Sequence, residues 1–148
     1  MITYLSTSIF DSPAMALVNP VNTVGVMGKG LALEFKRRYP KMFGVYYAMC
    51  FTGTFRIGDL FIYTENGKMI VNFPTKKHWR YPSRIEYIEA GLVQFAREYK
   101  QDGITSVAFP KLGCGYGGLN WQDVKVLMEA ALSHCDIPVY IHRCSKES

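Results

Sequence analysis

Two glycine-rich segments constrain the fold of this 148-residue chain more than any other feature. The first, residues 19–30, reads NPVNTVGVMGKG, and the second, residues 109–118, reads FPKLGCGYGG. Each follows an apolar run typical of a buried strand and precedes a helical pattern. Glycine at such a junction lets backbone N–H groups approach phosphate oxygens, and the positive end of the helix adds to the attraction. Two such loops on one sheet predict a clamp around a diphosphate.

The remaining patterns predict a layered α/β domain. Asn66-Gly67 lies between two apolar runs and predicts a two-residue hairpin, which adds an antiparallel pair to a mixed sheet. Ser83 and Asn120 are expected to be helix N-caps, and Glu86 completes a capping box with Ser83. In open α/β sheets, ligands bind beyond the carboxyl ends of the strands. We expect strands near 2–5, 14–19, 59–63, 68–73, 105–110 and 139–142, and helices near 30–39, 40–50, 83–99 and 121–134.

Composition and charge limit the classes of function. The formal net charge of +5 suits an anionic ligand and is compatible with nucleic acid. No apolar run approaches the roughly 20 residues of a membrane span, and the N-terminus lacks a signal-peptide pattern, so a cytoplasmic protein without membrane contact is expected. The four cysteines and three histidines show no metal-ligand spacing, and we predict no metal. No repeat or linker divides residues 1–148, so one domain, as a monomer, is expected.

Lys76 is the main catalytic candidate. It follows a predicted strand through Pro74 and Thr75, so it is expected to extend over the end of the sheet towards a ligand. The neighbouring cations Lys77 and Arg80 would lower its pKa, which suits a nucleophile or a proton shuttle. A purely electrostatic attraction of phosphate is the alternative role.

Three other features each allow two interpretations. The interleaved aromatic and basic side chains of residues 78–81, HWRY, suit stacking on a nucleobase, but equally a Trp anchored in the core beside a surface Arg. Asn22 can hydrogen bond a sugar hydroxyl pair, or cap its own turn. Cys114 has no nearby His or Asp to activate it, so we interpret it as a small buried side chain rather than a nucleophile.

Together, these segments resemble macrodomains, the ADP-ribose-binding α/β/α family. Residues 18–23, VNPVNT, match the family's first ribose-binding loop, and residues 109–119 match its diphosphate loop. Residues 72–80, NFPTKKHWR, are similar to macrodomains of the DarG type, which are DNA ADP-ribosyl glycohydrolase antitoxins. The resemblance covers essentially the whole chain. It implies a three-layer α/β/α sandwich with a central mixed sheet and no cofactor.

The resemblance also implies an activity and partners. The activity is removal of ADP-ribose from thymidine bases in single-stranded DNA, which reverses the modification by the paired toxin DarT. A non-catalytic ADP-ribose-binding module is one alternative, and a hydrolase of another ADP-ribosyl bond, such as a protein ester or ADP-ribose 1″-phosphate, is another. The implied partners are ADP-ribose, ADP-ribosylated single-stranded DNA and the cognate ADP-ribosyltransferase toxin. Such proteins bind the toxin mainly through a C-terminal domain that is not part of these 148 residues.

Site residues follow from the resemblance position by position. Lys76 is the implied catalytic residue, and Lys77, His78, Trp79 and Arg80 are the implied DNA-binding residues. The ADP-ribose-binding residues are Ser8 and Ile9 for adenine, with Asn22, Thr23, Met27, Gly28, Gly30, Thr75, Leu112, Gly113, Cys114, Gly115, Tyr116, Gly117 and Gly118 along the rest of the ligand.

Two positions depart from the family pattern. Ser8 stands where many macrodomains bind the adenine amine through an acidic residue. Gly117 stands where the relatives that act on modified proteins place an aspartate. The absence of a Lys–Asp catalytic pair favours the DNA-directed branch of the family.

Overall fold

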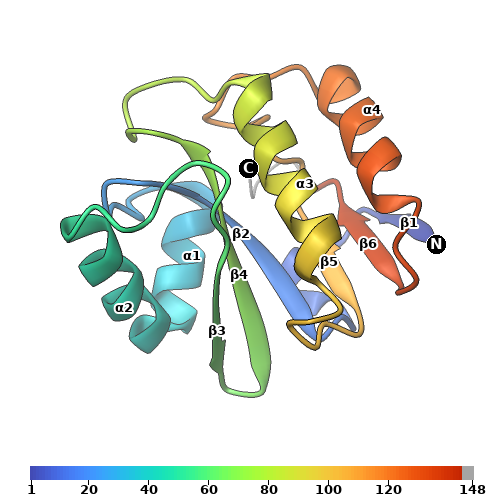
Figure 1. Ribbon diagram of the computed structural model, residues 1–148, viewed down its shortest axis with the longest axis horizontal. Helices are drawn as coiled ribbons and strands as arrows, with labels where there is room; N and C mark the ends of the chain where they lie inside the picture. The colour runs from blue at the N-terminus through green and yellow to red at the C-terminus, as the bar shows by residue number, and fades with distance from the viewer. Residues whose placement is uncertain (145–148) are drawn as a thin grey trace.

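A single mixed sheet forms the centre of the computed structural model, which describes residues 1–144 (Figure 1). Its strands lie in the order β1-β6-β5-β2-β4-β3, and neighbouring strands are parallel except for the antiparallel pair β3–β4. The strands are β1 (Ile2–Leu5), β2 (Ala16–Asn22), β3 (Phe61–Glu65), β4 (Lys68–Lys76), β5 (Val107–Phe109) and β6 (Val139–His142). The helices are α1 (Gly30–Arg38), α2 (Pro40–Phe51), α3 (Ile85–Glu98) and α4 (Trp121–Leu132), with a 3-10 turn η1 (Ile9–Asp11).

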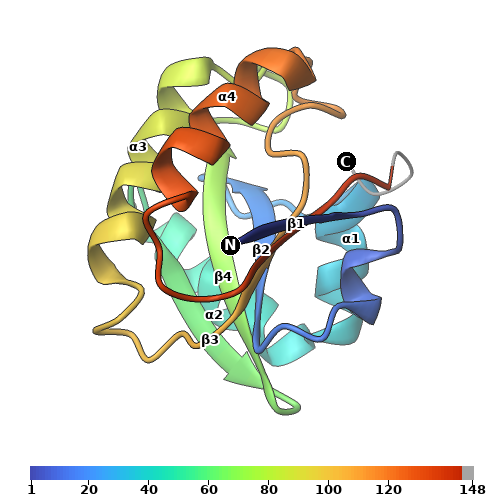
Figure 2. The same ribbon diagram turned by 90° about the vertical axis from the view of Figure 1, so that its right-hand side faces the viewer.

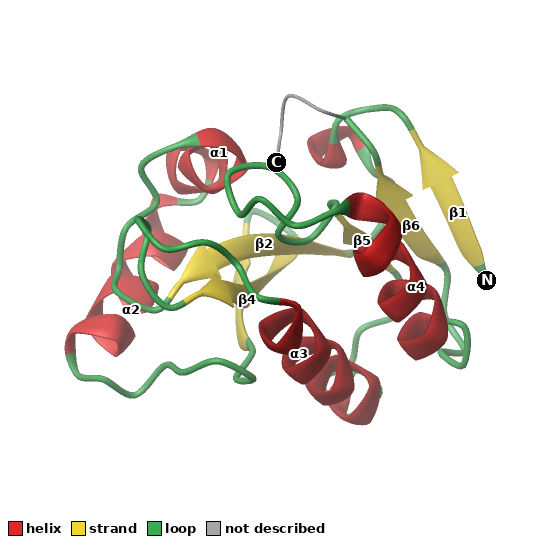
Figure 3. Ribbon diagram, turned by 90° about the horizontal axis from the view of Figure 1, so that it is seen from above, coloured by secondary structure: helices red, strands yellow, loops and turns green. Residues whose placement is uncertain are grey.

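The helices cover both faces of the sheet, which confirms the predicted three-layer α/β/α sandwich. Helices α1 and α2 lie on one face, and α3 and α4 lie side by side on the other (Figure 3). Each face has its own apolar core. Phe35 and Tyr46 are fully buried in the core beneath α1 and α2, and Phe95 and Phe109 meet edge-on in the core beneath α3 and α4. The edge strand β1 pairs with β6 (Figure 2).

Two local predictions are confirmed. Asn66 and Gly67 have φ angles of 52° and 77°, the positive values that a tight two-residue hairpin between β3 and β4 requires. The side chain of Asn120 caps α4 by accepting a hydrogen bond from the N–H of Gln122 at 2.8 Å. In the part of the chain that the structure describes, no helix is long and apolar enough to cross a membrane.

The predicted capping box at Ser83 is wrong. Helix α3 begins at Ile85 with Arg84 as its N-cap, and no side chain caps it. Ser83 is buried instead, and its N–H donates to the carbonyl of Gly117 at 3.0 Å. Glu86 pairs with Arg84 at 3.1 Å. The contact between Ser83 and the second glycine loop thus overrides the local capping preference.

Candidate active site

A cleft with a volume of about 880 Å³ opens at the carboxyl ends of β2, β4 and β5. Its walls come from residues within 20–32, 75–82 and 111–118, so the structure brings together the three segments that the sequence singled out. The pairing of β2 with β4 sets the relative position of the first two of these segments. The register of these two strands shifts between Val21 and Asn22, so that Asn22 lies opposite Lys76.

Asn22 shapes the first glycine loop. Its side-chain oxygen accepts hydrogen bonds from the N–H groups of Val24 (3.0 Å) and Val26 (3.3 Å), and its amide donates to the Val26 carbonyl at 2.7 Å. The hydroxyl of buried Tyr46 donates to the same side-chain oxygen at 2.9 Å. Burial raises the pKa of Tyr46, which keeps this hydroxyl a donor. The turn-capping interpretation of Asn22 is therefore confirmed, although the residue also lines the cleft.

The N-terminus of α1 also faces the cleft. Lys29 is its N-cap and provides no side-chain cap, and the first intrahelical donor is the N–H of Leu33, which bonds the Lys29 carbonyl at 3.2 Å. The N–H groups of Gly30, Leu31 and Ala32 therefore have no acceptor within the helix. Because Lys29, Leu31 and Ala32 line the cleft, these donors and the positive end of the helix suit an anionic ligand.

The second glycine loop offers a further set of donors. The loop is closed by two hydrogen bonds, from the N–H of Gly118 to the Gly115 carbonyl (3.1 Å) and from Leu119 to Gly113 (2.9 Å). Within residues 1–144, the N–H groups of Gly115, Tyr116 and Gly117 donate to no protein carbonyl. All three residues line the cleft. Successive unpaired N–H groups of this kind form an anion-binding nest.

Four cationic side chains line the cleft, and they are Lys29, Lys76, Arg80 and Lys111. Among the described residues, no Asp, Glu or His contributes to the lining. The cleft is therefore electropositive, which favours a diphosphate. Lys29 was not predicted, although its place between two glycines of a predicted phosphate loop could have identified it. The ammonium of Lys29 lies 5.5 Å from the ring centroid of Tyr116, so a side chain of the first glycine loop reaches the second.

Lys76 lies in the cleft at the end of β4. Its ammonium donates to the carbonyl of Trp79 at 3.4 Å. Its pKa is lowered from the ordinary lysine value, first by burial and second by the charge of Lys29. The lowered pKa agrees with the sequence prediction, but the neighbouring cation is Lys29. The ammonium of Lys77 instead lies 5.7 Å from the ring centroid of Tyr87.

An aromatic cluster forms one rim of the cleft. Trp79 and Tyr81 are 43% and 60% exposed, so the alternative of a core-anchored Trp79 is wrong. The ring of His78 contacts both, with centroids 5.4 Å and 5.0 Å apart. The guanidinium of Arg80 lies 4.7 Å over the Trp79 ring. Tyr81, the last residue of the interleaved segment, extends this exposed aromatic surface.

The predicted site residues fall into two groups. Those that line the cleft are Asn22, Gly28, Thr75, Lys76, Trp79, Arg80, Gly113, Gly115, Tyr116, Gly117 and Gly118. The others lie outside the lining and are Ser8, Ile9, Thr23, Met27, Gly30, Lys77, His78, Leu112 and Cys114.

Several residues of the second group have structural roles. Ile9, Met27 and Leu112 are buried in the two cores. The hydroxyl of Thr23 donates to the Lys77 carbonyl at 2.9 Å and so joins two walls of the cleft. Burial raises the pKa of the Cys114 thiol to about 11, which agrees with the prediction that this thiol is not a nucleophile.

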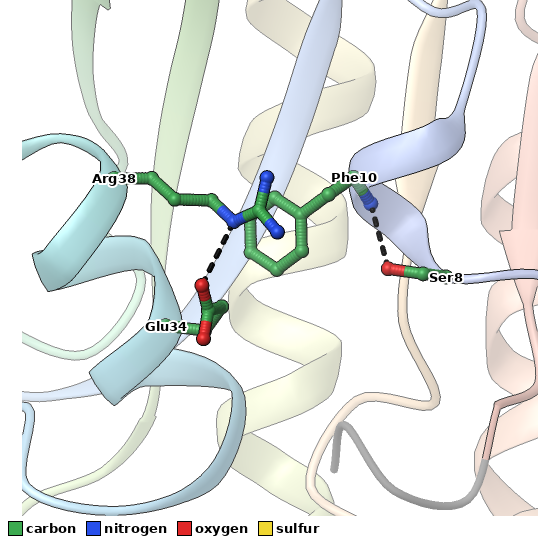
Figure 4. Close-up of polar contacts among 4 residues, drawn as sticks. All are labelled: Ser8, Phe10, Glu34 and Arg38. Carbon is green, nitrogen blue, oxygen red and sulfur yellow. Dashed lines mark hydrogen bonds and ion pairs between the residues drawn. The ribbon is translucent and has the colours of Figure 1, made fainter.

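The segment predicted to bind adenine is tied to α1 (Figure 4). The side-chain oxygen of Ser8 accepts a hydrogen bond from the N–H of Phe10 at 3.2 Å. The guanidinium of Arg38 lies 4.2 Å from the ring centroid of Phe10 and pairs with Glu34 at 2.9 Å. Ser8 therefore shapes the turn η1, and Phe10 fixes that turn against the helix. Within residues 1–144, no group of His, Cys, Asp and Glu side chains is arranged to hold a metal ion.

Comparisons with known proteins agree with this geometry. A family model described as Macro domain matches residues 18–128. The DNA ADP-ribosyl glycohydrolase of Mycobacterium tuberculosis is 50% identical over 135 residues, which cover 88% of this chain and 38% of that protein. The solved macrodomain of Mycobacterium tuberculosis DarG superposes with a TM-score of 0.92 at 48% identity, over 96% of this chain and 97% of that one. Thermosipho africanus DarTG in complex with ADP-ribose gives a TM-score of 0.90 at 37% identity, over 95% of this chain and 41% of that one. The chain thus spans about two fifths of the length of the curated relatives it matches.

Proposed function

Since this chain belongs to the macrodomain family, we propose that it is a DNA ADP-ribosyl glycohydrolase. It hydrolyses the N-glycosidic bond between ADP-ribose and a thymine base in single-stranded DNA. In doing so it acts as an antitoxin, because it reverses the modification made by a DNA-modifying toxin. The relatives named DNA ADP-ribosyl glycohydrolase, at 45% to 50% identity over most of this chain, support the choice of substrate.

The observation that carries the proposal is the position of Lys76. Its amine has a lowered pKa and lies in a cleft between two sets of unpaired backbone N–H groups. A site that only attracted phosphate would be best served by a fully protonated lysine. A lysine whose pKa is lowered gives up its proton more readily, which suits chemistry.

The cleft suggests how the ligand is held. The diphosphate lies between the N-terminus of α1 and the nest at Gly115, Tyr116 and Gly117, and Lys29 adds a positive charge. The distal ribose then lies near Asn22 and Tyr116, with its anomeric carbon towards Lys76. The remaining predicted contacts, from Ser8 and Ile9 for adenine to Gly30 and Leu112, are part of the same proposal.

Lys76 contributes in one of two ways. Cleavage of a glycosidic bond has oxocarbenium-like character, so fixed charges and donors around the sugar lower the barrier. In the first version the neutral amine attacks the anomeric carbon and displaces thymine, which takes up the proton that the amine loses. The sugar ring of the resulting glycosylamine opens to a Schiff base, and water hydrolyses this to release ADP-ribose and free Lys76. In the second, the ammonium assists the departing base by charge and proton transfer, and water attacks directly.

We propose that the DNA enters over the aromatic rim. Trp79 and Tyr81 offer exposed rings for stacking, and Arg80 provides a charge for the phosphate backbone. His78 supports both rings, and Lys77 contributes charge at longer range. The cognate ADP-ribosyltransferase toxin is the proposed protein partner, and DarTG of Thermosipho africanus supports this pairing. Residues 1–148 form one macrodomain in this proposal, and the cytoplasm is the expected compartment because the DNA substrate is there.

Parallel hydrolysis assays test the proposal. Purified protein is incubated with an oligonucleotide ADP-ribosylated on thymine, with a protein carrying an ADP-ribosyl ester, and with ADP-ribose 1″-phosphate. We expect release of ADP-ribose from the modified DNA, loss of that release in Lys76→Ala, and retained ADP-ribose binding by this variant. Lys125→Ala is the control, because Lys125 lies on α4 against Tyr4 and outside the cleft. Tight binding of modified DNA without turnover would instead identify a binding module, and equal rates of release by wild type and Lys76→Ala would remove Lys76 from the mechanism.

A further inference from the structure

Three aromatic side chains form a ladder along one side of α2. Phe43, Tyr47 and Phe51 are spaced four residues apart, so they lie above one another on the helix. Their ring centroids are 6.2 Å apart for Phe43 and Tyr47, and 6.5 Å apart for the stacked pair Tyr47 and Phe51. Tyr47 is 50% exposed and Phe51 is 81% exposed. Exposed aromatic side chains in a regular array are costly to leave in water and mark a binding surface.

The aromatic ladder is continuous with the cleft. A ring atom of Tyr47 lies 3.1 Å from the position that a β-carbon on Gly25 would take, so the first glycine loop rests on this ring. Val24 and Val26 flank Gly25 and are both exposed, and Val26 lines the cleft. The C-terminal end of α2, which carries Phe51, lies towards the same end of the sheet as the cleft (Figure 1). A strand that leaves the cleft over Val26 and Gly25 therefore meets the ladder at Tyr47.

Charge at the ladder favours a nucleic acid. Helix α2 carries no acidic side chain, and the ammonium of Lys36 lies 4.3 Å from the ring centroid of Phe43 at the far end. Lys41 lies in the first turn of α2, at the same end. The carboxylate of Glu65 accepts hydrogen bonds from N–H groups at the start of α2, including that of Met42 at 2.8 Å. Aromatic rings for stacking, next to cations for phosphates, are the combination that binds single strands without sequence preference.

We propose that the aromatic ladder binds the nucleotides that flank the modified base in single-stranded DNA. The proposal rests on the proposed function of the cleft and adds a second contact to it. Eight residues separate Phe43 from Phe51, a rise of about 12 Å along the helix, which accommodates roughly three stacked nucleotides. The rim at Trp79 and Tyr81 then receives the strand on one side of the modified nucleotide, and the ladder receives it on the other.

The dependence of binding and turnover on DNA length tests this inference. Wild type and Phe51→Ala are compared on a modified mononucleotide and on a modified single strand of about sixteen nucleotides. We expect kcat/KM and affinity for the long strand to fall about fivefold or more in Phe51→Ala, equivalent to about 1 kcal/mol per lost stacked base. Values for the mononucleotide stay unchanged. Val126→Ala is the matched control, since Val126 is 66% exposed on α4, across the sheet from α2.

Three outcomes would overturn the ladder as a DNA site. In the first, wild type binds the long strand no more tightly than the mononucleotide. In the second, Phe51→Ala loses affinity and kcat/KM equally on both substrates. The third is a Phe51→Ala protein that keeps its preference for long DNA but loses affinity for the cognate toxin, which would assign the surface to a protein. A wild type that releases no ADP-ribose from either substrate contradicts the proposed function instead, and the affinities still test the ladder.

Discussion

The side-chain oxygen of Ser83 fills the space that a β-carbon at Gly117 would occupy. The carbonyl of Gly113 crowds the same space from the other side. The second glycine loop therefore accepts only glycine at this position unless its backbone moves. This packing keeps any side chain, and in particular a carboxylate, out of the cleft at position 117.

We predict that Gly117→Ala lowers the affinity for ADP-ribose about tenfold or more, because the loop must shift and its N–H donors lose their alignment. Titration calorimetry with ADP-ribose measures the change. Gly44→Ala is the control, since a β-carbon at this exposed helical glycine meets no atom within 4 Å. Ser83→Gly is expected to restore little of the lost affinity, because the Gly113 carbonyl remains in place. Wild-type affinity in Gly117→Ala would contradict the packing argument.

Lys29 is predicted to set the pH range of catalysis. Burial lowers the pKa of Lys76 most, and the charge of Lys29 lowers it further, so Lys29→Met moves that pKa part of the way up towards the ordinary lysine value. If the neutral amine attacks, the rate rises with pH through this pKa. The rising limb of the plot of rate against pH then shifts to higher pH in the variant. If the ammonium assists the leaving base, the rate falls through the same pKa, and that limb also shifts to higher pH.

Single-turnover rates across pH provide the measurement for Lys29→Met. Lys29→Arg keeps the charge and is expected to leave the limb in place. The direction of the limb in wild type separates the two roles of Lys76, and borohydride reduction traps a covalent adduct only if a Schiff base forms. If the limb does not shift in Lys29→Met, burial alone lowers the pKa of Lys76.

Gly91 is predicted to be essential for packing α3 against β4. A β-carbon at this position would overlap the ring of Phe73, which is fully buried in the core. Gly91→Ala should therefore lower the free energy of unfolding by about 1–3 kcal/mol, despite the better helix propensity of alanine. Urea unfolding measures this loss, and Gly44→Ala is expected to be neutral or stabilising by up to about 1 kcal/mol. Equal stability of the two variants would mean that the Phe73 ring moves freely aside.

Arg80 is predicted to contact a DNA phosphate. Neutralising it in Arg80→Gln should lower the slope of log affinity against log salt concentration by about 0.7, the value for one phosphate contact in a single strand. Lys77→Gln should change the slope less, because its ammonium lies against Tyr87 rather than in the cleft. Fluorescence anisotropy at several salt concentrations gives both slopes. If the two variants share one slope with wild type, the DNA path does not pass over this rim.

Features with a local cause were predictable from the sequence. Asn66-Gly67 and Asn120 act through their own backbone neighbours, so the hairpin and the cap of α4 are encoded over a few residues. Ser83 carries an equally good capping signal, but its role is decided by Gly117, 34 positions along the chain. The influence of Lys29 on the pKa of Lys76 was not predicted for a related reason. This influence depends on two strands meeting side by side, and no spacing in the sequence reports that distance.

The pairing of β2 with β4 has a consequence for how such a domain can change. Asn22 and Lys76 are the last paired residues of β2 and β4, so their separation is fixed by the pairing of these two strands. The hairpin at Asn66-Gly67 lies at the other end of β4, about 25 Å away. Insertions or fusions at that hairpin leave the reactive geometry untouched. An engineer can therefore attach a label or a second domain there and keep the chemistry of the opposite end intact.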